Sequence, residues 1–139
     1  MGEIIRQSKI ILLLLFSSLL LYFVFRPGIQ KLKRDLDFKN PATTIIQAAF
    51  KLGERKDVSA VKPLLANILD PRMCTNINFK GMTVCYCRLG ALQKISNLKP
   101  PIKLDQFEVD TIAAQFYLNW ALKKGLIKSK EEINLNYYR

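Results

Sequence analysis

The sequence predicts an all-α protein in which one transmembrane helix precedes a small helical domain. Three observations support this prediction. Apolar residues after residue 41 recur at the helical period in four successive segments. Strand-like alternation is not convincing in any part of that region, although residues 78–84 suit a brief extended stretch. Residues 10–25 form an uncharged apolar run.

The apolar run reads IILLLLFSSLLLYFVF and predicts a membrane anchor. As a helix it is about 24 Å long, and Lys9 and Arg26 at its ends can extend toward the headgroups. The alternative is a cleaved secretory signal, because Arg6 and Lys9 precede the run, and it would leave a secreted domain. No small-residue cleavage pattern follows the run, so we expect a short tail at 1–9 and an uncleaved anchor at 10–25.

Residues 26–40 are expected to form a juxtamembrane linker, because Pro27-Gly28 breaks the preceding helix and charges of both signs follow. More basic residues follow the anchor than precede it, which by the positive-inside rule favours a cytoplasmic domain. A short tail with its own positive charges usually stays inside while the longer C-terminal part is exported. We give the second argument more weight and expect a single-pass membrane protein whose domain is extracytoplasmic.

The helical domain, residues 41–139, is predicted to begin with two antiparallel helices. Asn40 and Pro41 suit the N-cap and first position of the first helix, whose apolar stripe reaches Gly53. A short turn follows, and Asp57 is placed to cap the second helix. Pro63 lacks an N–H, so this helix either starts near Ala60 or kinks.

Two further helices follow a loop at residues 72–82. The first is predicted from Thr83 to just before Asn97. The second, over residues 105–124, has the longest apolar stripe, and Asp105 and Glu108 have capping-box spacing at its start. Its aromatic residues should face the core, so that it closes the domain, and a short final helix is expected after Ser129. These aromatic residues are Phe116, Tyr117 and Trp120.

An internal repeat links the first and third of these helices. Residues 52–57 and 92–97 each close an apolar helix, 40 residues apart, and periods near this length are typical of stacked helix pairs. The stretch AAFKLGERKDVSAVKPLLANILDP, residues 48–71, resembles a HEAT repeat of the phycobilisome-lyase-like kind, and GALQKISN, residues 90–97, is a second match.

The resemblance covers about residues 42–97 and implies a short HEAT-like α-α superhelix of about two helix pairs plus a capping helix. In that family a small residue and Leu-Gly close the first helix and an Asp starts the second, as Ala48, Leu52-Gly53 and Asp57 do here. The chain departs from the family by inserting a Cys-bearing loop and by having Cys85 where an Arg often follows a Val. The resemblance implies a fold and no specific chemistry.

Cys74, Cys85 and Cys87 are the three thiols of the chain. A bridge from Cys74 to Cys85 or Cys87 would close the inserted loop and would require an oxidising compartment. Three buried free thiols are an equal alternative. Cys85-Tyr86-Cys87 is not a CxxC motif, and three Cys without His make a poor zinc site. The sequence therefore predicts no metal and no cofactor.

The charge and the residue inventory limit the functions that can be expected. The chain has 22 Lys+Arg, 11 Asp+Glu and no His, which excludes Ser-His-Asp and Cys-His catalysis and HExxH zinc sites. We expect a non-enzymatic, membrane-tethered module that binds or scaffolds another protein. Loops carry much of protein recognition, so the expected contacts lie in the inserted loop. They are Met73, Asn76, Phe79 and Lys80.

The alternative from the charge is a basic domain that binds anionic lipid headgroups or nucleic acid. Nucleic acid is the less favoured of these, because the lysines are scattered and no nucleic-acid motif is present. A lyase-like activity rests on the family resemblance alone, since no acid–base or nucleophile constellation supports it. The expected contacts with an anionic surface are Lys31, Lys33, Arg34, Arg55 and Lys56.

Overall fold

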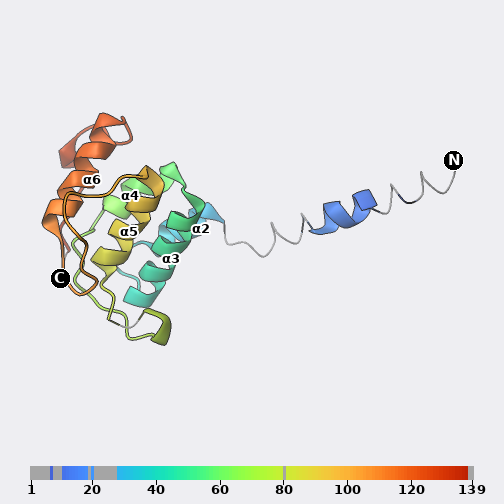
Figure 1. The fold of residues 1–139 in the computed structure, drawn as a ribbon, viewed down its shortest axis with the longest axis horizontal. Helices are drawn as coiled ribbons and strands as arrows, with labels where there is room; N and C mark the ends of the chain where they lie inside the picture. The colour runs from blue at the N-terminus through green and yellow to red at the C-terminus, as the bar shows by residue number, and fades with distance from the viewer. Residues whose placement is uncertain (1–6, 8–10, 19, 21–27, 80, 138–139) are drawn as a thin grey trace.

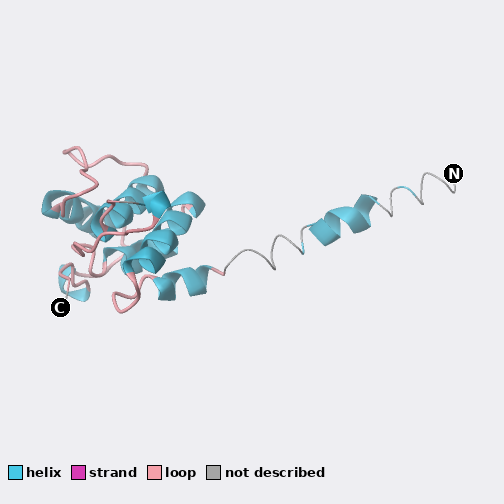
Figure 2. Ribbon diagram, turned by 90° about the horizontal axis from the view of Figure 1, so that it is seen from below, coloured by secondary structure: helices cyan, strands magenta, loops and turns pink. Residues whose placement is uncertain are grey.

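The computed structural model describes residues 7, 11–18, 20, 28–79 and 81–137, and this part of the chain is helical, as predicted (Figure 1). No strand forms among these residues, and the one feature of sheet type is an isolated antiparallel bridge between Met73 and Thr83 (Figure 2). The elements of the domain, in chain order, are α2 (Ile29–Asp35), α3 (Ala42–Arg55), η1 (Val58–Ala60), α4 (Val61–Leu65), η2 (Ile77–Phe79), α5 (Val84–Ser96), α6 (Thr111–Lys123) and η3 (Lys130–Glu132).

The predicted anchor, residues 10–25, lies partly outside the described residues. Residues 11–18 are helical and exposed. The hydroxyls of Ser17 and Ser18 donate hydrogen bonds to the carbonyl oxygens of Leu14 and Leu15, both at 2.9 Å. Within the described ranges, no helix is both long and apolar enough to span a membrane.

The region expected as a linker belongs to the domain from residue 28 onward. Helix α2 buries Leu32, and Leu36 just after it is also in the core. Helix α2 packs on α3, and the Leu36 carbonyl accepts a hydrogen bond from Arg88. Two leucines four residues apart form one apolar face, which explains why this charged segment folds against the domain instead of remaining a spacer.

Helices α3 and α5 lie side by side and run in the same direction (Figure 1). Helix α3 starts at Ala42, one residue later than predicted, with Pro41 as its N-cap. Each helix ends on a left-handed residue, Lys56 after α3 and Asn97 after α5. The two segments that repeat in the sequence are therefore also neighbours in space.

The second predicted helix is shorter than expected. Asp57 caps η1 by accepting a hydrogen bond from the Ser59 N–H at 2.9 Å, and α4 then ends at Leu65. The C-terminal segment forms hydrogen bonds with the backbone groups that a longer α4 would use. Asn67 donates its N–H to the Asn134 carbonyl, and Leu69 donates its N–H to the Leu135 carbonyl. Asn67 is left-handed, which stops α4 from continuing.

The predicted start of the last long helix at Asp105 is wrong. Helix α6 begins at Thr111, and its N-cap is Asp110, whose carboxylate accepts a hydrogen bond from the Ala113 N–H at 2.8 Å. Asp105 instead accepts from the Phe107 N–H within a turn. Tyr117 is fully buried as expected, whereas Phe116 and Trp120 are half-buried against the core. The short element after Ser129 is the 3-10 helix η3.

Candidate functional site

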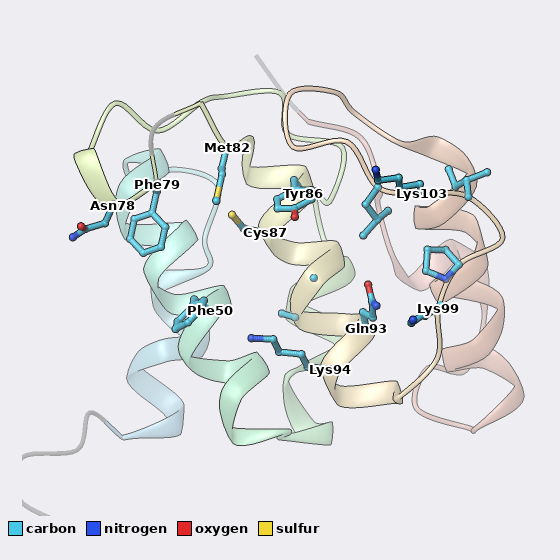
Figure 3. Close-up of a pocket in the computed structure, with 15 residues that line it drawn as sticks. Phe50, Asn78, Phe79, Met82, Tyr86, Cys87, Gln93, Lys94, Lys99 and Lys103 are labelled. Atoms are coloured by element: carbon cyan, nitrogen blue, oxygen red, sulfur yellow. The ribbon is translucent and has the colours of Figure 1, made fainter.

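An open groove of about 890 Å³ crosses the outer surface of α5 (Figure 3). One wall comes from α3 and the loop around η2, and the opposite wall comes from the extended segment that follows α5. The lining residues are Phe50, Asn78, Phe79, Met82, Tyr86, Cys87, Gly90, Ala91, Gln93, Lys94, Lys99, Pro100, Ile102, Lys103 and Leu104.

The α3 side of the groove is aromatic. Phe50 projects from α3, and 51% of its surface is exposed. Its ring centroid is 6.4 Å from that of Phe79, which comes from η2, and the rings are tilted by 59°. Figure 3 shows the Phe79 ring between Met82 and the Phe50 ring along this side of the groove. Apolar side chains left open to solvent in a concave surface are typical of binding sites.

Gly90 forms part of the floor, on the face of α5 that the groove crosses. A Cβ added at this position would meet no atom within 4 Å. The position is helical and does not need a glycine for its backbone conformation. The missing side chain therefore leaves free space above the helix, and a ligand can approach the α5 backbone there.

The charged residues that line the groove are Lys94, Lys99 and Lys103, and none of the described lining residues is acidic. Lys94 lies over Phe50, with its Nζ 4.8 Å from the ring centroid, and it forms an ion pair with Glu54 of α3. Figure 3 shows Lys94 on the α3 side of α5 and Lys99 on the opposite side. The groove thus combines an apolar interior with positive charge on both edges.

Cys74 lies in the inserted loop, Cys85 and Cys87 lie in α5, and all three are free thiols in the structure. Cys74 and Cys85 are buried, and Cys87 is half-buried at the groove. The loop is closed instead by backbone hydrogen bonds, from Cys74 N–H to the Met82 carbonyl and from Gly81 N–H to the Cys74 carbonyl.

Burial makes the thiols of Cys85 and Cys87 weak nucleophiles. It raises the pKa of Cys85 to about 11 and, with a smaller effect from the neighbouring Cys74 and Cys85, that of Cys87 to about 12. The nucleophile is the thiolate, which is scarce at neutral pH with such values. Among the described residues, no group of His, Cys, Asp and Glu is arranged to hold a metal ion.

The residues that the sequence predicted as partner contacts do not all lie at one site. Met73 is 48% exposed and Asn76 is half-buried, both on the loop, whereas Phe79 points into the groove. Lys80 lies outside the described residues. The groove therefore includes only part of this predicted set, and Phe50 and Gly90 were missed because periodicity alone does not reveal which helix face remains uncovered.

The residues predicted to contact an anionic surface lie on other elements. Lys31 and Arg34 are exposed on α2, and Lys33 is half-buried there. Arg55 is half-buried at the end of α3, and Lys56 is exposed just beyond it. None of the five lines the groove.

A buried polar cluster beneath the helices was not predicted. Arg88 of α5 is fully buried and donates hydrogen bonds to four backbone carbonyls. Nearby, the buried carboxylate of Asp70 pairs with Arg72, which in turn donates to the carbonyls of Asn40 and Phe38. The carbonyls that Arg88 contacts belong to Leu36, Pro63, Leu64 and Ala66.

The cluster has a structural role. Burial lowers the pKa of Arg88 to about 10, but at neutral pH the side chain is still charged and its charge is shared among carbonyl dipoles. It joins α5 to the ends of α2 and α4. The signal that could have revealed it is Arg88 itself, which follows Val84 by four residues and so lies on the apolar stripe.

Comparisons of the chain with protein-family models, with curated proteins and with solved structures found no match. The groove is the candidate functional site because it combines exposed apolar side chains with three lysines and has no acidic residue among its described lining residues.

Proposed function

We propose that the chain is a membrane-tethered, HEAT-like helical-repeat module that binds or scaffolds another protein and catalyses no reaction. The single observation that carries this proposal is the open groove with an apolar interior, since exposed apolar surfaces of this kind mark interaction sites. The groove offers surface and charge, and its cysteine is a weak nucleophile, so binding is the function it suits best.

The repeat part of the proposal rests on the arrangement of the helices. Helices α3 and α5 are parallel neighbours, as equivalent helices of successive repeats would be, and α4 packs against both α5 and α6. Helix pairs that stack in this way bury one face against the next pair. A stack of about two pairs leaves an uncovered surface, which suits a binding module.

The tether rests on the composition of residues 10–25, an uncharged run of sufficient length for a short anchor. We propose an uncleaved single-pass anchor with the domain outside the cytoplasm. Since α2 is part of the domain, the spacer between the anchor and the folded part is short. A partner would then be held close to the membrane.

Site-specific photo-cross-linking in intact membranes tests the proposal. Benzoylphenylalanine replaces Phe79 in the groove, Ile77 on the loop or Ile112 on α6 in separate chains. We expect an ultraviolet-dependent adduct with a protein from at least one position. Failure to form a protein adduct from any position would overturn the interaction function.

The tether is tested on the same membranes. The chain should stay in the membrane pellet after alkaline carbonate extraction and retain its N-terminal peptide by mass spectrometry. A domain outside the cytoplasm would be digested by protease added to intact cells. A chain that lacks its first 25 residues would overturn the anchor and favour a secreted domain.

A second candidate function, binding to anionic lipid headgroups, is supported by the exposure of Lys31 and Arg34 on α2. Basic residues near such a surface contribute about 1 kcal/mol each. Co-sedimentation with phosphatidylserine vesicles should then fall as salt is added and fall further for the variant K31Q/R34Q. Equal sedimentation with phosphatidylcholine vesicles would contradict this function.

A further inference from the structure

We propose that the groove over α5 binds an acidic amphipathic helix of the partner protein. This inference rests on the proposed function and specifies the surface and the chemistry of the partner. The helix would place its apolar side chains against Phe50, Phe79 and Ile102 and its carboxylates at the lysines on the two edges. Helix-in-groove recognition commonly uses apolar anchors spaced three and four residues apart.

The shape of the groove suits a helix. Its interior combines aromatic and aliphatic side chains from both walls, and Phe50 is left half-exposed although it lies beside other apolar groups. The absence of a side chain at Gly90 opens the floor between these walls. An anchor side chain entering there would contact α5 directly, and an apolar side chain over Phe50 would contribute to binding by burying apolar area.

The positions of the charges identify the partner as acidic. The three lysines that line the groove face no acidic lining residue, so a basic partner would be repelled. They also lie on opposite edges, with Lys94 near α3 and Lys99 on the segment after α5 (Figure 3). A helix with acidic residues on both flanks of an apolar stripe would present carboxylates to both edges.

Lys94 is positioned in advance for this contact. Its ammonium is held over the Phe50 ring and beside Glu54, and both partners lie on α3. About half of the side-chain surface of Lys94 and of Glu54 is exposed, so the pair is accessible to a second carboxylate. A partner carboxylate would share Lys94 with Glu54, while Lys99 and Lys103 would supply charges on the other edge.

The test uses the full chain in phosphatidylcholine nanodiscs, which avoids detergent in the groove. The probe is a fluorescein-labelled helical peptide of about 16 residues with Leu at positions i, i+3, i+4 and i+7 and Glu on both flanks. The matched peptide has Lys in place of each Glu. Fluorescence anisotropy should show that the acidic peptide binds at least about tenfold more tightly than the Lys peptide. Added salt should reduce this difference in affinity.

Substitutions place the binding in the groove. Gly90→Phe should weaken binding of the acidic peptide by about tenfold or more, because the ring fills the floor. The variant K99Q/K103Q should also weaken binding by about tenfold, whereas K123Q/K124Q, which removes the same charge from the end of α6, should not. Circular dichroism checks that each variant is folded.

Four results would overturn the inference. The two peptides binding equally would remove the charge argument, and an acidic peptide insensitive to Gly90→Phe would bind elsewhere. Displacement of the acidic peptide by oleate, with oleate binding lost in Gly90→Phe, would identify the groove as a lipid site. In the cross-linking experiment, protein adducts from position 77 or 112 but not from position 79 would support the interaction function. They would overturn only the claim that the partner binds in the groove.

Discussion

Gly53 of α3 faces Ala91 of α5 at very short range. A Cβ built on Gly53 would lie 3.2 Å from the Ala91 Cβ and 2.9 Å from the Ala91 Cα, and the second distance is shorter than real Cβ atoms show. The close atom belongs to the backbone of a helix and cannot move aside as a flexible side chain would. Gly53 therefore sets the distance between the two parallel helices and, through it, the width of the groove above them.

We predict that Gly53→Ala destabilises the protein although alanine is the better helix former. Forcing α3 and α5 apart should lower the free energy of unfolding by about 1–3 kcal/mol. Gly90→Ala is the matched control, since its Cβ meets nothing and should stabilise α5 by up to about 1 kcal/mol. Urea unfolding followed by circular dichroism measures both. Equal stability of the two variants would contradict the close approach.

We predict that Arg88→Met is strongly destabilising, because four backbone carbonyls lose a donor that is itself buried. The expected loss in the free energy of unfolding is about 3 kcal/mol. Arg88→Lys keeps the charge but not the planar fork, so it should recover only part of the loss. If Arg88→Met unfolds at the same urea concentration as the unaltered chain, the hydrogen-bond cluster does not stabilise the fold.

The local signals in the sequence predicted well those features that depend on a few neighbouring residues. Asp57 caps the element that follows it, as its type and position indicated. Failures arose where distant contacts decide the outcome. Helix α2 folds because its apolar face packs against α3. Helix α4 ends early because the Asn67 N–H donates its hydrogen bond to the Asn134 carbonyl instead of to a carbonyl within a longer helix.

The groove was predictable only in part, for a similar physical reason. Periodicity identifies the apolar face of a helix but not which portion of it a neighbour covers. Phe79 was expected to meet a partner because it lies on a loop, and it does point into the groove. Phe50 and the Lys99 edge depend on how the segment after α5 crosses the surface, which no local pattern specifies.

We predict different costs for two aspartates near the start of α6. Asp110→Ala removes the N-cap of α6 and should lower the free energy of unfolding by about 1 kcal/mol. Asp105→Ala removes only an acceptor within an exposed turn and should cost less than about 0.5 kcal/mol. Thermal or urea unfolding distinguishes them. A larger loss for Asp105→Ala would restore the longer helix that the sequence predicted.

We predict that stability falls as the pH rises above about 9. In the folded chain, burial raises the pKa of Cys85 to about 11 and that of Cys87 to about 12, whereas exposed thiols have the ordinary value of 9.0. Between these values the folded state binds more protons than the unfolded state, so the stabilisation is complete below pH 9 and is lost as the pH approaches 11 to 12.

The measurement is the urea midpoint at several pH values from 7 to about 11, compared with the variant C85A/C87A. The variant starts from a lower stability because it loses packed sulfur atoms, so the slope against pH is the quantity to compare. That slope should be shallower in the variant, and the remainder should come in part from Tyr117, whose pKa burial raises to about 12. Identical slopes would mean that the thiols of the folded chain ionise as easily as exposed ones, and the burial of Cys85 and Cys87 would then have no linkage to stability.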